Sequence, residues 1–384
     1  MDDLRLLVCR GLSHVVMIQM TPIIESTHRS MSMSGVADMG ETASRGTVLV
    51  TGGTGYLAGW LIVELLKSGY RVRATVRDTA RAEPARRAIL DRSAGARSLQ
   101  LVQADLLDDE GWEPALDGVD AVLHTASPMP VGNEADLITT ARDGTRRVLT
   151  TAARVGVRRV VFTSSGTAAR SSNPSSTTTE DMWSEPSGDA THVYPDSKIY
   201  AERLAWELAD ELGLDLTAVL PSFMQGPPVG APGRAGTIDV VRRLLDRAMP
   251  ALPRLGWNVV DVRDEARLHV LALEQPAAIG ERYNGSGTFL WYRDVARILR
   301  EGLPEQKKIP ARELPDFLVR LAARRDPHLA MIVDELGIVR TVDSSKARRQ
   351  LGWTTRDAQT TILDTARALI AQERPPSTSS PRTP

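Results

Sequence analysis

Cysteine is almost absent from this chain of 384 residues, and the single Cys9 excludes an internal disulfide framework. The sequence also has no cluster of cysteines and histidines, so no metal site is expected. The 47 basic and 48 acidic residues leave a formal net charge of −1 at pH 7, which argues against a nucleic-acid partner. No apolar run approaches the length that spans a membrane, so no membrane partner is expected either.

The two ends of the chain differ in composition from its middle. Residues 4–20 are apolar but interrupted by Arg5, Arg10 and His14 after an acidic start, unlike a secretory signal. We expect residues 1–45 to form a disordered or loosely attached extension, with an N-terminal targeting role as the alternative. The tail at residues 373–384, rich in proline, serine and threonine, is also expected to be disordered.

Residues 47–78 read as a strand, a tight glycine turn, a helix and a second strand. Gly52 and Gly55 lack a Cβ, so the backbone can turn sharply and approach a bound group. Ala58 stands where a small residue lets the helix pack closely against a sheet. The free N–H groups at the start of this helix predict a site for a pyrophosphate, and the flanking strands give the motif a dinucleotide-binding context.

The end of the second strand indicates which dinucleotide is bound. An acidic residue there favours NAD, whereas an arginine accommodates the 2′-phosphate of NADP. Arg77 follows the strand directly and Asp78 comes next, with Arg73 and Arg81 nearby. We expect NADP, with NAD as the alternative that Asp78 keeps open.

Strands and helices alternate through the next part of the chain. Apolar runs predict further strands at residues 99–102, 121–124, 160–163, 216–220 and 283–284. This alternation predicts an α/β fold, a Rossmann-type doubly wound parallel sheet covered on both faces. Helices are expected at residues 79–91, 135–155 and 199–211, and, in a smaller and mostly helical C-terminal lobe, at 238–247, 261–275, 291–301, 313–325, 343–351 and 359–371.

Ligands bind such sheets at the carboxyl ends of their strands. The strand ends at Thr51, Arg77, Asp105, His124 and Ser164 should therefore line one crevice. Asp105 could meet the adenine amino group or cap a helix. His124 ends an apolar strand, which favours a structural or cofactor-neighbouring role over catalysis.

A candidate catalytic group follows. Ser164 and Ser165 stand at the end of a predicted central strand, and Tyr194 and Lys198 lie four residues apart on a predicted helix, so they share one face. A phenol has a pKa near 10, and a neighbouring ammonium is expected to lower it, giving an acid/base for a carbonyl oxygen. Ser165 could donate a hydrogen bond to the same oxygen, with Ser164 as the alternative.

The chain resembles the extended short-chain dehydrogenase/reductase family, part of the NAD-dependent epimerase/dehydratase superfamily. It is most similar there to the dihydroflavonol reductase, cinnamoyl-CoA reductase and aldehyde reductase group. The resemblance covers about residues 47–370. Its separate motifs are VTGGTGYLA at 50–58, ATVRD at 74–78, HTASP at 124–128, TSS at 163–165, EDMWS at 180–184, YPDSK at 194–198 and DVRD at 261–264.

The resemblance implies a role for each matching residue. Tyr194 would protonate the nascent alkoxide, Lys198 would also bind the nicotinamide ribose, and Ser165 would orient the carbonyl. The cofactor-binding residues it implies are Thr51, Gly52, Gly55, Tyr56, Leu57, Arg77, Asp105, Leu106, Thr125, Ala126, Tyr194, Lys198 and Pro221. The sequence departs from the family pattern at 224–227, before a Gly-Pro pair, and in the Ser/Thr-rich loop at 171–179.

The sequence therefore predicts one reductase unit at residues 46–372. Residues 46–230 would mainly bind the dinucleotide and 231–372 would mainly form the substrate lobe. The expected function is NADP-dependent reduction of an aldehyde or ketone to an alcohol by a cytoplasmic enzyme that could form a homodimer. The alternatives are an NAD-dependent sugar-nucleotide epimerase or dehydratase and, ranked lower, a non-catalytic NADP-binding regulatory protein.

Overall fold

The computed structural model describes residues 45–373 except 94–97, 129–135, 172, 190–191, 231–235, 248, 307 and 325–331. The expected N-terminal extension, apart from Arg45, and the expected C-terminal tail, apart from Glu373, lie outside the described residues.

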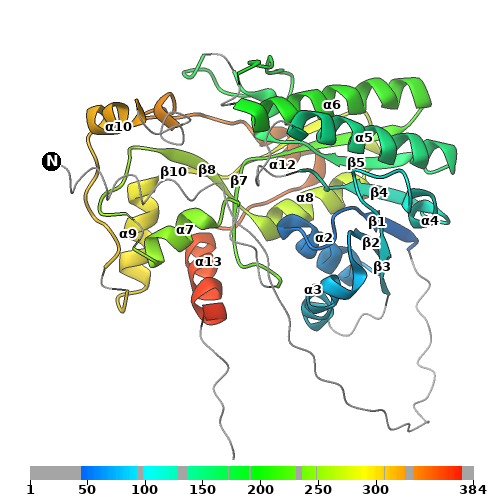
Figure 1. Cartoon of the computed structure of the whole chain (residues 1–384), viewed down its shortest axis with the longest axis horizontal. Helices are drawn as coiled ribbons and strands as arrows, with labels where there is room; N and C mark the ends of the chain where they lie inside the picture. The colour runs from blue at the N-terminus through cyan, green and yellow to red at the C-terminus, as the bar shows by residue number, and fades with distance from the viewer. Residues whose placement is uncertain are drawn as a thin grey trace, which may run out of the picture.

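Seven parallel strands form the central sheet (Figure 1). In spatial order they are β3 (Leu99–Gln103), β2 (Arg71–Val76), β1 (Thr47–Val50), β4 (Ala121–His124), β5 (Arg159–Thr163), β6 (Asp215–Pro221) and β9 (Arg282–Gly285). The order reverses between β1 and β4, and this switch point is where open α/β sheets bind ligands. The doubly wound parallel sheet expected from the sequence is confirmed.

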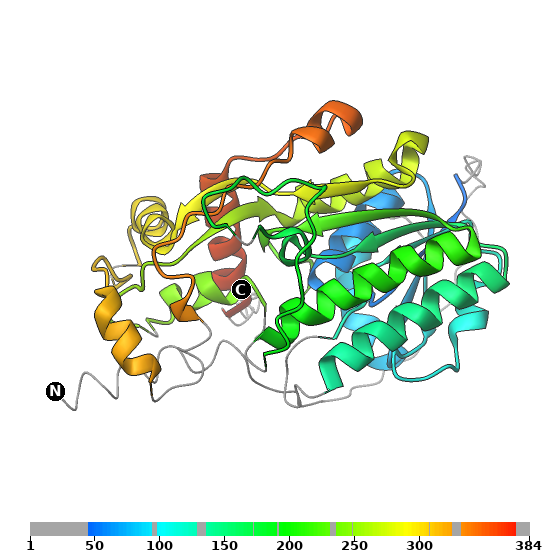
Figure 2. The ribbon, with the colours of Figure 1, turned by 90° about the horizontal axis from the view of Figure 1, so that it is seen from above.

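Helices cover both faces of this sheet (Figure 2). Helices α2 (Tyr56–Lys67), α3 (Thr79–Arg92) and α8 (Val262–Glu274) lie on one face. Helices α4 (Trp112–Leu116), α5 (Leu137–Arg154) and α6 (Val193–Leu212) lie on the other. Because both faces are covered, the central strands β1 (TVLV) and β4 (AVLH) are buried along their whole length.

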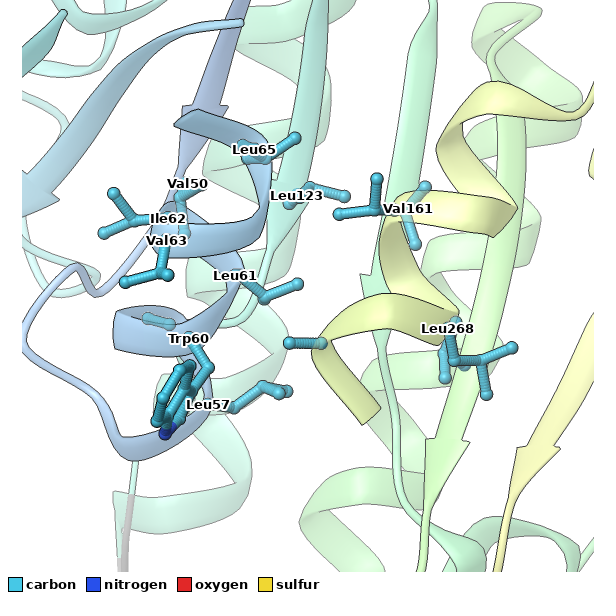
Figure 3. Packing of buried hydrophobic residues seen from close by; sticks show 14 of the residues in the cluster. Val50, Leu57, Trp60, Leu61, Ile62, Val63, Leu65, Leu123, Val161 and Leu268 are labelled. Atoms are coloured by element: carbon cyan, nitrogen blue, oxygen red, sulfur yellow. The ribbon is translucent and has the colours of Figure 1, made fainter. Parts of the chain in front are cut away.

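Helix α2, which follows the glycine turn, is buried on nearly all sides. Leu61, Ile62, Val63 and Leu65 are fully buried, and Figure 3 shows α2 beside α8 over the central strands, with Leu61 on the side that faces α8. A helix that is apolar all round belongs in the interior rather than at the surface. This packing fixes the N-terminus of α2 at the carboxyl edge of β1.

The C-terminal lobe contains a second sheet that the sequence did not predict. Its three strands are β10 (Thr288–Trp291), β8 (Gly256–Asp261) and β7 (Phe223–Gln225), in that order. Phe223 stacks on Trp257 with ring centroids 4.7 Å apart, which ties β7 to β8. The lobe's helices are α7 (Asp239–Leu245), α9 (Tyr292–Gly302), α10 (Asp316–Ala323), α12 (Ser345–Leu351) and α13 (Ala358–Glu373).

One helix boundary expected in this lobe was wrong. Helix α10 begins at Asp316 rather than at Glu313, because Glu313 forms a β-bridge with Leu252 and Pro315 precedes the helix. Among the residues that the structure describes, no helix combines the length and the apolar character needed to cross a membrane.

Candidate active site

The glycine turn between β1 and α2 is closely packed. Gly52 has a φ of +70°, a conformation that favours glycine, and a Cβ there would lie 3.2 Å from Ala126. A Cβ on Gly53 would lie 2.7 Å from the Cβ of Ala74. The N–H groups of Gly52 and Gly53 are bound by Thr75, whereas those in the first turn of α2 have no acceptor within the helix. The turn is therefore a rigid cradle with donors facing outward, which fits a pyrophosphate.

Thr51 joins the glycine turn to the end of β4. Its hydroxyl oxygen accepts the N–H groups of Thr125 at 3.0 Å and Ala126 at 2.9 Å. Its one hydrogen is then left for Nδ1 of His124, 2.9 Å away. His124 therefore carries its proton on Nε2, and burial, with a smaller contribution from Lys198, lowers its pKa to about 3. A neutral buried imidazole agrees with the non-catalytic role expected for His124.

The charged residues of β2 and of the turn after it differ in whether they already have partners. The carboxylate of Asp78 accepts the N–H of Arg81 and is the N-cap of α3. Arg73 donates to the carbonyls of Pro114, Ala115 and Asp117. Arg77 is exposed and has no hydrogen-bond or ion-pair partner among the described residues. The residue available to a 2′-phosphate is therefore Arg77.

Asp105 and Leu106 follow β3. The Asp105 carboxylate accepts the N–H of Leu107 at 3.1 Å, so it stabilises a local turn. The alternative that Asp105 caps a helix is wrong, because α4 begins later and Gly111 is its N-cap. The side chain of Leu106 packs against Gly144 of α5, where a Cβ would lie 2.8 Å away. Both residues are half-buried at the carboxyl edge of the sheet.

The structure brings Ser165 and Tyr194 together. Ser165 is the N-cap of the short 3-10 helix η2 (Gly166–Ala169) and accepts two hydrogen bonds from Thr167, one from its N–H and one from its hydroxyl. Ser165 lies close enough to Tyr194 for its side chain to lower the pKa of the phenol. Ser164 points elsewhere: it is buried and donates to the carboxylate of Glu202. Of the two serines, Ser165 is the one that can share an oxygen with the phenol.

The expectation that Lys198 lowers the pKa of Tyr194 was wrong. The Lys198 ammonium lies 5.9 Å from the centre of the Tyr194 ring. Burial raises the pKa of Tyr194, and the hydrogen bond from Ser165 offsets this only in part. Burial also lowers the pKa of Lys198 to about 8, against an opposing contribution from Glu202. The pair is therefore a protonated phenol beside a cation that titrates close to neutral pH.

The glycine turn and the Tyr194 group lie at the same edge of the sheet. Thr51 binds His124, and Lys198 is close enough to His124 to contribute to lowering its pKa. The serines lie at the end of β5, the strand next to β4. A molecule held by the turn can thus extend toward the phenol across the switch point of the sheet.

The wall beside this edge connects α2 to the C-terminal lobe. The Tyr56 hydroxyl donates to the carbonyl of Gly226 at 2.8 Å, and the N–H of Gly226 donates to the Thr365 hydroxyl in α13 at 2.6 Å. Tyr56 therefore offers its backbone, rather than its phenol, to a bound dinucleotide. Leu57 is buried in α2, and Pro221 ends β6 opposite Gly285 of β9.

Three polar residues around the site were not predicted from the sequence. Thr167 donates to Ser165, Thr75 accepts from Gly52, and Glu202 accepts from Ser164. Glu202 alone left a signal, since it is a carboxylate one helical turn after Lys198 among apolar residues. Within the described residues, no group of three histidine, cysteine, aspartate or glutamate side chains could hold a metal ion.

Known proteins resemble this chain in sequence and in fold. The profile of the NAD dependent epimerase/dehydratase family matches residues 48–284. Cinnamoyl-CoA reductase 1 of Oryza sativa subsp. japonica is 38% identical over 279 residues, 71% of this chain and 81% of that protein. Tetraketide alpha-pyrone reductase 2 of Arabidopsis thaliana is 33% identical over 268 residues, 67% of this chain and 82% of that protein.

A solved structure matches as well. Yeast methylglyoxal/isovaleraldehyde reductase Gre2, crystallised with NADPH, superposes with a TM-score of 0.71 and 26% sequence identity. The match covers 85% of this chain and 99% of the yeast chain.

Proposed function

Because the chain belongs to the NAD dependent epimerase/dehydratase family, we propose that it is an NADP-dependent oxidoreductase that reduces an aldehyde or ketone to the alcohol. Its relatives named above are reductases, and the similar yeast reductase was crystallised with NADPH. The observation that carries the proposal is that Ser165, Tyr194 and Lys198 lie together at the sheet edge that also holds the glycine turn.

The residues of the turn and of β2 fit NADP. The first-turn N–H groups of α2 would bind the pyrophosphate, and Arg77 would bind the 2′-phosphate. Asp78 is already bound to Arg81, so it does not compete for the ribose hydroxyls. Asp105, Leu106, Thr125 and Ala126 lie along the same edge and would contact the rest of the dinucleotide. When bound, the cofactor supplies a hydride to the carbonyl carbon.

The protein's own side chains would supply the proton that the substrate oxygen receives. The carbonyl oxygen would accept hydrogen bonds from the hydroxyls of Ser165 and Tyr194. As negative charge develops on that oxygen, the Tyr194 hydroxyl would transfer its proton to it and give the alcohol. The raised pKa of Tyr194 suits this direction, because the phenol is protonated at neutral pH before the reaction. The Lys198 cation would bind the nicotinamide ribose beside the reacting carbonyl.

The test is a panel of aldehydes, ketones and flavonoid- or steroid-like carbonyls, assayed by NADPH absorbance with NADH in parallel. We expect NADPH consumption with at least one class of carbonyl and a lower rate with NADH. Absorbance of the purified protein checks the alternative, since tightly bound NAD would indicate a sugar-nucleotide epimerase or dehydratase. The homodimer, the cytoplasmic location and the division of the chain at residue 230 remain predictions.

A further inference from the structure

A buried ion pair lies directly behind the proposed catalytic group. The Glu202 carboxylate accepts Nε of Arg282 at 2.7 Å and Nη2 at 3.2 Å. Glu202 is fully buried in α6 and Arg282, the first residue of β9, is 7% exposed. Because a charge without a partner is costly to bury, each residue depends on the other for its place in the core.

Every N–H group of the Arg282 guanidinium has an acceptor. Besides the two bonds to Glu202, Nη1 donates to the carbonyls of Glu180 and Met182 at 2.6 Å each, and Nη2 donates to that of Ala168 at 3.5 Å. The guanidinium also lies 3.9 Å from the ring centre of Trp183. One side chain thus connects four segments: α6, η2, the loop at 180–183 and β9.

These segments carry the reacting side chains. Glu202 accepts the hydroxyl of Ser164, whose chain neighbour Ser165 acts on the phenol of Tyr194. Glu202 also stands one turn after Lys198 on α6, a spacing that places both side chains on one helix face. The Glu202–Arg282 pair therefore contacts Ser164, next to Ser165, and the helix that carries Lys198. It does not contact the space where a carbonyl would lie.

We propose that Glu202, held in place by Arg282, is a positioning residue for reduction: it fixes the Ser164–Ser165 strand end and maintains the cationic form of Lys198. This inference rests on the proposed reductase function.

The charges that face Lys198 support the second part. His124 of β4 is buried and neutral, and Tyr194 of α6 is protonated. Neither supplies a negative charge to a cation whose pKa burial lowers to about 8. Among the described residues, Glu202 is the carboxylate whose field raises the pKa of Lys198. Without that charge, Lys198 should lose its proton at a lower pH.

The test is the pH profile of kcat/KM for NADPH-dependent reduction by Glu202→Gln and Glu202→Asp. The amide keeps the shape of the side chain without its charge, so the basic limb should move to lower pH by about one unit. The aspartate keeps the charge, so its basic limb should stay near that of the wild type while kcat falls. The control is Glu185→Gln, which removes an exposed carboxylate paired with Arg203 of α6. This variant should change neither the basic limb nor kcat.

A purely structural role would reduce the stability or amount of protein and leave the basic limb of Glu202→Gln in place, and this result would overturn the proposal. If the Glu202 variants do not fold, the Ser164→Ala variant tests the positioning role instead. It removes only the hydrogen bond from Ser164 to Glu202, so kcat should fall about tenfold with KM for NADPH unchanged. An unchanged kcat would overturn the proposal. Failure of the reductase function itself is distinguishable, because the wild type would then consume no NADPH with any carbonyl.

Discussion

Asp78 is bound to the residue three positions after it: its carboxylate accepts the backbone N–H of Arg81 at 3.0 Å. The same carboxylate lies 3.3 Å from the Arg81 guanidinium. Arg77 and Asp78 follow β2 in succession, and the sequence alone leaves open which of them contacts the cofactor. In the structure Asp78 caps helix α3, whereas Arg77 is left exposed.

We therefore predict that Arg77→Ala impairs the use of NADPH selectively. Loss of a charge-assisted contact to phosphate costs about 1.5–3 kcal/mol, so kcat/KM for NADPH should fall roughly tenfold to a hundredfold. The value for NADH should change little, since NADH lacks the 2′-phosphate. Arg81→Ala is the control, because that arginine is paired with Asp78. Equal losses with both cofactors would contradict the assignment of Arg77.

Tyr194→Phe should remove the proton donor and keep the shape of the side chain. Turnover should fall by roughly 10²–10⁴, the usual contribution of general acid–base catalysis. Binding of NADPH, followed by fluorescence titration, should persist. The matched control is Tyr200→Phe, an exposed tyrosine on the same helix, which should leave turnover unchanged. A Tyr194→Phe enzyme with a near wild-type rate would refute the role of Tyr194.

The rate of reduction should decline in alkaline solution because of Lys198. Burial lowers the pKa of Lys198 to about 8, so the side chain is a cation below that pH and loses its charge above it. The phenol cannot cause this limb, since the pKa of Tyr194 is raised. We expect kcat/KM measured from pH 6 to pH 10 to fall with an apparent pKa near 8. Lys198→Arg, which keeps a cation, should lose this limb, and persistence of the limb would exclude Lys198 as its source.

Glu265 of α8 should make the protein less stable as the pH rises. Both carboxyl oxygens are buried against Gly285 without a hydrogen-bond partner among the described residues. Burial, with a contribution from Asp264, raises the pKa of Glu265 from 4.5 to about 8. The folded chain therefore holds a proton that the unfolded chain releases above pH 4.5, and stability falls between pH 4.5 and about pH 8.

Glu265→Gln should remove this dependence. At pH 8 its free energy of unfolding, from urea titration, should exceed that of the wild type by about 4 kcal/mol. The difference should shrink toward pH 5. Glu207→Gln on α6, where the side chain is exposed, should show no such trend. A Glu265→Gln protein that is less stable than the wild type at pH 8 would contradict the protonated, unpartnered state.

The main sheet could be predicted because its inner strands carry short apolar runs between turns, such as those in β1 (TVLV) and β5 (RVVFT). Strand β1 and helix α2 gave the clearest pattern, since Gly52 and Gly55 mark the turn between them. The second sheet was missed because β7 has only three residues, while β8 and β10 run directly into helices α8 and α9. No turn residues separate these two strands from the helices that follow, so the pattern favours the helices. The pairing of β7 and β10 with β8 arises from contacts between distant segments.

The residues of the site could be predicted from the sequence, but the directions of their pKa shifts could not. The four-residue spacing of Tyr194 and Lys198 indicates a shared helix face, yet spacing says nothing of burial, and burial sets the direction of both pKa shifts. Similarly, Arg282 reads as an ordinary charged residue before a short strand. Only the fold brings it to Glu202, a residue eighty positions earlier in the chain.

The hydrogen bonds from Tyr56 to Gly226 and from Gly226 to Thr365 have a consequence for dissecting the protein. They connect Tyr56, the first residue of α2, to helix α13. The two helices lie on opposite sides of residue 230, where the dinucleotide-binding part and the substrate lobe would be divided. A shortened protein that stops before α13 would leave the Gly226 N–H without its acceptor and loosen the anchor of Tyr56. Its affinity for a dinucleotide should therefore suffer even though every residue of the glycine turn is still present.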